Sequence, residues 1–100
     1  MLRYIFLSVF ALLLLTACGN KDLDQLRQSG FTECKECDLS GVDLSGADLS
    51  DAKLYKTQLV GADLTGANLT NVMLERANLT DANLTRTNLT DANLYKVHFW

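Results

Sequence analysis

The fold is decided by the stretch Ala62-Asp63-Leu64-Thr65-Gly66-Ala67-Asn68-Leu69-Thr70-Asn71. It contains two five-residue units with the same order of residue types: a small residue, Asp or Asn, Leu, and two turn formers. The same spacing extends in both directions, with Phe99 closing the series. The leucines stand at positions Leu39, Leu44, Leu49, Leu54, Leu59, Leu64, Leu69, Leu74, Leu79, Leu84, Leu89 and Leu94.

A period of five fits neither regular secondary structure. On an α-helix, steps of five turn the side chain by about 500°, so the leucines would scatter around the axis. On a straight strand, an odd step moves every second leucine to the opposite face. The chain must therefore bend once in every five residues, which lets each leucine point toward a common axis, as in a solenoid.

The positions two residues before the leucines support this interpretation, because residues two apart on an extended segment share a face. All of them are small or β-branched. They are Cys37, Val42, Ala47, Ala52, Thr57, Ala62, Ala67, Val72, Ala77, Ala82, Thr87, Ala92 and Val97. Ser, Thr, Gly, Asp and Asn dominate the remaining sites, and these residue types favour turns.

The repeat from Cys37 to Phe99 resembles the pentapeptide repeat family, whose consensus is close to Ala-Asp/Asn-Leu-x-x. This resemblance implies an all-β fold, a right-handed quadrilateral β-helix with twenty residues per coil and a little over three coils. We expect residues 32–100 to form this solenoid. Each coil then contacts only its neighbours, so both ends need covering.

The N-terminal segment predicts export and a lipid anchor. A basic start at Arg3 precedes the apolar run from Tyr4 to Leu15, which is too short for a permanent membrane span and is typical of a signal peptide. The sequence Leu15-Thr16-Ala17-Cys18 resembles the lipobox of bacterial lipoproteins. The resemblance implies cleavage after residues 1–17 and acyl chains on Cys18, which would bind the membrane. A secreted protein with an ordinary thiol at Cys18 is the alternative.

The resemblance to lipoproteins also suggests a location. Asp directly after the lipidated Cys favours inner-membrane retention in that class, whereas Gly19 follows here. We therefore expect an outer-membrane anchor facing the periplasm, or the outside of the cell if the organism has a single membrane. Residues 18–21 would form the tether.

A short helix is expected next, as a cap on the first coil within residues 22–31. Asp22 and Gln25 fit a capping box, Leu23 and Leu26 form an i, i+3 stripe, and Gly30 fits a C-terminal stop. Eight residues are too few for a stable isolated helix, so this segment must pack on the repeat. At the other end, Phe99 and Trp100 are the expected cover, and an exposed last coil predicts a possible homodimer through these residues.

Little in the sequence indicates catalysis. Cys34 and Cys37 fall at inward sites, which leaves open a structural disulfide or buried free thiols, while a redox pair would need an exposed, activated thiol. A zinc site lacks further ligands, and His98 is expected to face solvent without an acid or nucleophile beside it. We expect no catalytic residues, no metal and no cofactor, and therefore no enzyme.

One side of the predicted solenoid differs from the others. If sites twenty apart stack, one wall carries aromatic and basic side chains of the kind found in protein contacts. Side-chain ladders on a solvated wall are the alternative. The residues are Lys53, Tyr55, Lys56, Met73, Glu75, Arg76, Asn93, Tyr95 and Lys96.

These features favour a non-enzymatic, lipid-anchored envelope module that binds an unknown envelope protein or glycan. A thiol-active envelope protein using Cys34 and Cys37 is an alternative. Some members of the resembling family are acidic rods that mimic DNA and bind gyrase, but this repeat is short, has a basic wall and is exported. Without residues 1–17, eight cations face twelve anions, a net charge of −4 that does not suggest nucleic-acid binding.

Overall fold

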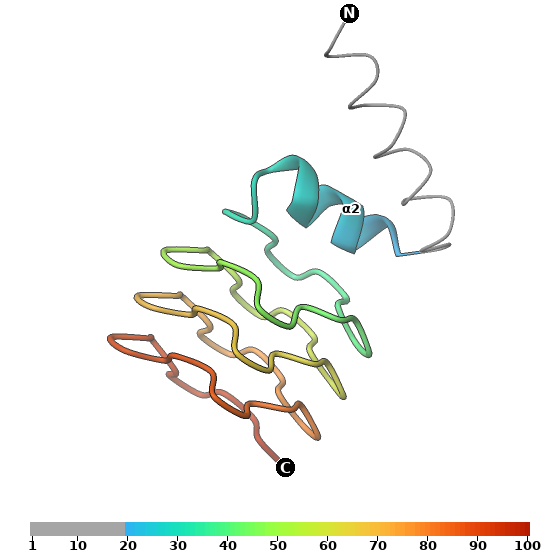
Figure 1. The fold of residues 1–100 in the computed structure, drawn as a ribbon. Helices are drawn as coiled ribbons and strands as arrows, with labels where there is room; N and C mark the ends of the chain where they lie inside the picture. The colour runs from blue at the N-terminus through green and yellow to red at the C-terminus, as the bar shows by residue number, and fades with distance from the viewer. Residues whose placement is uncertain (1–19) are drawn as a thin grey trace, which may run out of the picture.

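A computed structural model describes residues 20–100 as one helix followed by a coil of short extended segments and turns (Figure 1). The expected signal peptide and the lipidated Cys18 lie outside the described residues. Within residues 20–100, the structure has no helix both long and apolar enough to cross a bilayer.

Parallel β-bridges between residues twenty apart hold the coil together. They begin with Glu33 and Lys53 and end with Asn78 and His98. Each extended segment contributes one bridging residue, so the described residues contain isolated bridges but no longer strand. The Leu64 N–H donates to the Asn83 carbonyl at 2.9 Å, and the Asn83 N–H donates to the Ala62 carbonyl at 2.9 Å. This pattern stacks successive coils at the usual spacing of neighbouring strands, about 4.8 Å.

The bends lie where the five-residue period requires them. Two residues after each inward side chain, φ is positive, with values between 55° and 71° from Glu36 to Lys96. This left-handed conformation favours glycine, which stands at several of these corners, including Gly61 and Gly66. The corners turn the chain so that successive extended segments face the same lumen.

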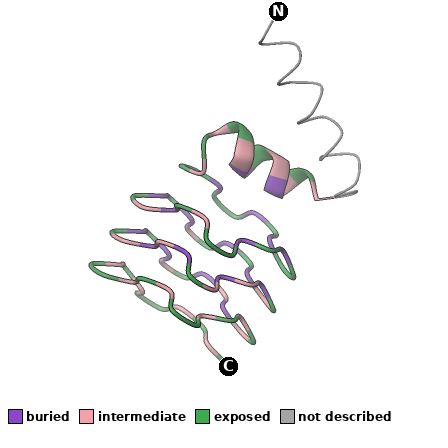
Figure 2. Cartoon of the chain, viewed as in Figure 1, coloured by how far each residue is buried: buried purple, intermediate pink, exposed green. Residues whose placement is uncertain are grey.

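The lumen is filled by leucine, as the period predicts. From Leu49 to Leu79, each inward leucine is at most 1% exposed, and the small sites beside them, such as Ala62 and Ala67, are buried as well. Figure 2 shows the buried residues along the stacked coils, whereas the last coil has only intermediate and exposed ones. One buried polar group, Thr57, donates its hydroxyl to the Cys34 carbonyl at 2.7 Å.

Helix α2, Lys21–Gln28, lies over the first coil (Figure 1). Its buried residues, Leu23 and Leu26, belong to the same core cluster as the inward leucines. The predicted capping box was wrong: Asn20 is the N-cap, and its Oδ1 accepts from the N–H groups of Asp22 and Leu23. The helix therefore includes Lys21, one residue of the expected tether.

The C-terminal end differs from the prediction at one residue. Phe99 is partly buried and packs against the core, but Trp100 is 96% exposed. The two rings lie 6.3 Å apart, with Trp100 outside the lumen. Of the two residues expected to cover this end, only Phe99 contributes to the core.

Candidate functional site

The predicted basic and aromatic residues share one wall of the coil, which we call the Tyr/Lys wall. Its register follows from the bridge of Met73 to both Lys53 and Asn93. Further along the wall, the Arg76 N–H donates to the Tyr95 carbonyl at 2.8 Å. The outward side chains of successive coils therefore form columns, separated by one strand spacing.

The first coil adds three residues to this wall that the sequence analysis did not include: Glu33, Lys35 and Glu36. Lys35 Nζ lies 5.9 Å from the centre of the Tyr55 ring, and Glu36 Oε1 lies 3.2 Å from Lys56 Nζ. The twenty-residue spacing could have revealed them. Cys34 in place of leucine obscured the unit to which they belong.

Contacts between coils engage several side chains in the half of the wall nearest α2. Lys56 pairs with Glu36, and the Tyr55 hydroxyl contacts the Met73 sulfur. These exposed pairs contribute little to stability, because water screens them. They do occupy the side chains that a partner would otherwise bind.

The other half of the wall retains one cation, Lys96, that forms no salt bridge among residues 20–100. Its Nζ lies 5.1 Å from the centre of the neighbouring Tyr95 ring. Arg76 reaches only its neighbour Glu75, at 3.7 Å. Tyr95 is 57% exposed and Met73 is 37% exposed. Tyr95 and Lys96, with Arg76 one coil earlier, thus combine aromatic area with positive charge, and aromatic residues and Arg are enriched in protein interfaces.

The two walls between Val42 and Asp51, and their continuations in later coils, are chemically uniform. Their Asp or Asn side chains accept from the N–H and the hydroxyl of the Ser or Thr two residues later. The Asp43 Oδ1, for example, accepts from the Ser45 hydroxyl at 2.6 Å and from its N–H at 2.9 Å. These local bonds explain why polar side chains recur here in a fixed order.

The same bonds affect the acid titration of the first coil. Hydrogen bonds from Ser40, Ser45 and Ser50, through the hydroxyl first and then the backbone N–H, lower the pKa values of three aspartates, Asp38, Asp43 and Asp48. Because each of these pKa values is lower in the folded chain than in the unfolded chain, the ionised aspartates stabilise the fold. This stabilisation is fully present at pH values above the unfolded pKa of about 3.9. It is lost as pH falls through the folded pKa values.

We therefore expect the unfolding midpoint in urea to fall as the pH decreases below about 4. Replacing Asp38, Asp43 and Asp48 with Asn should weaken this dependence, because Asn already occupies the same site at Asn68 and accepts the same bonds there. Urea titrations of both proteins between pH 7 and pH 2.5 would measure it. If the unfolding midpoint of the triple variant depended on pH as strongly as that of the unaltered chain, these three aspartates would not be the source of the dependence.

Cys34 and Cys37 are buried and joined by a disulfide, with their Cα atoms 5.5 Å apart. The Cys34 sulfur also lies 3.4 Å from the Asp22 carbonyl, near enough for a reduced thiol to donate a hydrogen bond. Both oxidation states are therefore compatible with α2 over the first coil. Burial argues against thiol exchange with a partner, which requires access to the sulfur.

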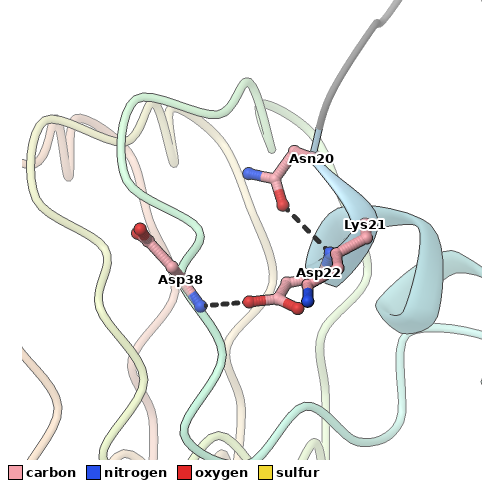
Figure 3. Close-up of a pocket in the computed structure, with 4 residues that line it drawn as sticks. All are labelled: Asn20, Lys21, Asp22 and Asp38. Atoms are coloured by element: carbon pink, nitrogen blue, oxygen red, sulfur yellow. Dashed lines mark hydrogen bonds between the residues drawn. The ribbon is translucent and has the colours of Figure 1, made fainter.

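A cavity of about 230 Å³ lies where α2 meets the first coil (Figure 3). Two of its polar side chains are already engaged: Asn20 caps the helix, and the Asp22 Oδ2 accepts from the Asp38 N–H at 2.7 Å. This cavity is the seam between helix and coil. It presents no convergent set of unused polar groups for a ligand.

The structure assembles no catalytic constellation from the residues that it describes. His98 is exposed and bridges Asn78 through its backbone. Between Asn20 and Trp100, no three His, Cys, Asp or Glu side chains are grouped so as to hold a metal ion.

Comparison with known proteins identifies the repeat. The family model described as Pentapeptide repeats matches residues 32–71 and 62–100, with eight copies. No curated protein sequence matches significantly. Among solved structures, the chain is similar to HetL, a pentapeptide repeat protein involved in heterocyst differentiation regulation from the cyanobacterium Nostoc sp. strain PCC 7120. The identity is 33%, over 67% of this chain and 32% of HetL, with a TM-score of 0.64.

A pentapeptide repeat protein from the Arabidopsis thaliana thylakoid lumen is similarly related, at 34% identity and a TM-score of 0.53. The match covers 68% of this chain and 49% of that protein. The chain thus spans about a third of the first relative and about half of the second.

Proposed function

Because the chain belongs to the pentapeptide repeat family, we propose that it is a non-enzymatic interaction module, tethered to the bacterial cell envelope by lipid on Cys18. Members of this family form right-handed quadrilateral β-helices and are generally structural or scaffold proteins. Function in such folds depends on particular surfaces, since the fold itself supports many roles. The exposed group Arg76, Tyr95 and Lys96 is the observation that carries the proposal.

The position of this group relative to the tether supports the proposal. Cys18 precedes the helix cap Asn20 by two residues, which span at most about 7 Å. Lipid on Cys18 would therefore keep α2 close to the bilayer. Tyr95 and Lys96 belong to the last coil, at the opposite end from α2 (Figure 1), where a partner would meet less obstruction from lipid.

The charge distribution also favours an orientation with α2 near the bilayer and the last coil away from it. Residues 32–51 carry six carboxylates and one ammonium group, a net charge of −5 near the proposed tether. Anionic lipid headgroups repel such a surface within about one Debye length. The first coil would thus stand off the bilayer, with the Tyr/Lys wall exposed along its side. The partner would be an acidic envelope protein or glycan, and Gly19 after Cys18 favours the outer membrane.

The proposal predicts site-specific capture of the partner in living cells. A photo-crosslinking amino acid at Tyr95 should capture a partner, whereas the same probe at Thr85, at the equivalent position of the opposite wall, should not. Replacing Arg76 and Lys96 with Ser should reduce capture from Tyr95 about tenfold or more, since the charge-assisted bonds are lost. Mass spectrometry identifies the captured species.

The anchor is tested in the same cells. Replacing Cys18 with Ser should move the protein out of the membrane fraction and abolish the mass added by lipid. Equal capture from Tyr95 and Thr85 would contradict the role of the wall, and unchanged fractionation of the Cys18 variant would contradict the tether.

A further inference from the structure

The corner between Cys34 and Cys37 is closed differently from the later corners of the coil. From Leu39 onward, the carbonyl at each leucine site accepts from the backbone N–H three residues later, as the Leu39 carbonyl does from the Val42 N–H at 3.3 Å. Within residues 20–100, the Cys37 N–H makes no such bond to the Cys34 carbonyl. That carbonyl accepts instead from the Thr57 hydroxyl of the next coil, and the disulfide joins the two sides of the corner. A covalent bond therefore stands where the later corners have a hydrogen bond.

Helix α2 covers this corner (Figure 1). Cys34 is 0% exposed and Cys37 is 4% exposed. Leu23 and Leu26 of α2 are buried in the same core cluster as the two cysteines. The Asp22 carbonyl, also on α2, lies 3.4 Å from the Cys34 sulfur. Because a thiol reductant must contact one of the two sulfurs, the docked helix blocks its approach.

The helix is held by few contacts, so it can lift while the coil stays folded. It has eight residues, Lys21–Gln28, of which Leu23 and Leu26 are buried. So short a helix is not stable alone in water, and weakly held elements open locally more often than the whole molecule unfolds. Lifting of α2 is therefore the shortest route by which solvent reaches the disulfide.

We propose that the Cys34–Cys37 disulfide is a redox switch for the docking of α2, reduced by a dithiol when the helix lifts. A thiolate of the dithiol attacks the sulfur of Cys37, the less buried of the two, and forms a mixed disulfide. The Cys34 thiolate leaves and takes up a proton. The second thiolate of the dithiol then displaces Cys37, which is protonated in turn. The chain gains two electrons and two protons, and the dithiol becomes a disulfide.

Reduction weakens the site on which α2 rests. The reduced corner has neither the covalent bond nor the turn hydrogen bond, and the Thr57 hydroxyl and the bonds to the next coil remain. The Cys34 thiol can donate to the Asp22 carbonyl, but a thiol is a weak donor and does not replace the lost constraint. The first coil therefore loosens at this corner, and α2 docks less firmly.

The switch has a consequence for the reach of the domain from the membrane. A released α2 adds residues 20–31 to the tether, about 40 Å of extended chain. This consequence rests on the proposed function, since it requires lipid on Cys18, whereas the switch itself does not. The purified chain tests the switch without any envelope partner.

The rate of reduction tests whether α2 controls access. The full chain in detergent micelles is treated with dithiothreitol, and alkylation of Cys34 and Cys37 is followed by mass spectrometry. Leu26→Ala should speed reduction about tenfold or more, because α2 lifts more often. Gln28→Ala, at an exposed position of the same helix, should leave the rate unchanged.

Leu69→Ala separates lifting of α2 from unfolding of the whole coil. Leu69 is buried in a later coil, so its loss destabilises the fold without touching α2, and reduction should proceed at the rate of the unaltered chain. Equal rates in the Leu26 variant and the unaltered chain would overturn the proposal. So would equal acceleration by Leu26→Ala and Leu69→Ala, because reduction would then follow global unfolding.

Hydrogen exchange tests the effect of reduction on docking. Amides of α2 should exchange about tenfold faster in the reduced chain than in the oxidised chain, and reoxidation should restore the slow exchange. A variant with both Cys34 and Cys37 replaced by Ala is the control, and dithiothreitol should not alter its exchange. Equal exchange of α2 in the oxidised and reduced chains would overturn the switch.

Discussion

Replacing Leu69 with Ala is expected to lower the free energy of unfolding by about 3 to 5 kcal/mol. Leu69 is 1% exposed and lies between coils whose backbones are fixed by the ladder, so the surroundings cannot collapse into the space left by the side chain. Urea unfolding followed by circular dichroism would measure the loss.

Leu89 provides the matched control, because it occupies the same wall and the same site one coil later. Since it is already partly exposed, Leu89→Ala should cost about 1 to 2 kcal/mol, mostly from lost burial. Equal losses at the two positions would show that the last coil is as well packed as the middle one, contrary to the structure.

The second large effect is expected at the junction of α2 with the coil. Leu26→Ala should cost about 2 to 4 kcal/mol, because Leu26 is fully buried and is one of two residues through which α2 joins the core. An eight-residue helix is not stable alone in water, so weakened packing should release it from the coil.

Hydrogen exchange would locate this loss. We expect faster exchange in α2 and in the first coil, up to about Asp51, with little change beyond Val72, because each coil depends mainly on its neighbours. Gln28→Ala, an exposed position on the same helix, should leave exchange unchanged. Uniformly faster exchange over the whole chain would contradict this local release.

The lumen could be predicted from the sequence because a single periodicity determines it. Leucine at every fifth position excludes both a continuous helix and a straight strand. The inward sites from Leu39 to Leu79 are buried accordingly. The columns of the Tyr/Lys wall required one further assumption, twenty residues per coil, which the bridge between Lys53 and Met73 matches.

The contacts that the sequence did not reveal join segments distant along the chain. Asp22 was interpreted as a helix cap, but its carboxylate accepts from the Asp38 N–H, sixteen residues away. Asn20 takes the cap position instead. Likewise, the Lys56 pairing with Glu36 depends on side-chain reach between coils, which residue spacing alone does not determine.

The twenty-residue ladder has a consequence for changes in chain length. Inserting one five-residue unit after Asn71 would preserve the pattern of lumen residues, yet rotate everything downstream by a quarter turn about the long axis. Tyr95 would then lie around the corner from Tyr55, and the Tyr/Lys wall would be divided between two sides of the rod. Only insertions or deletions of whole coils conserve its angular phase.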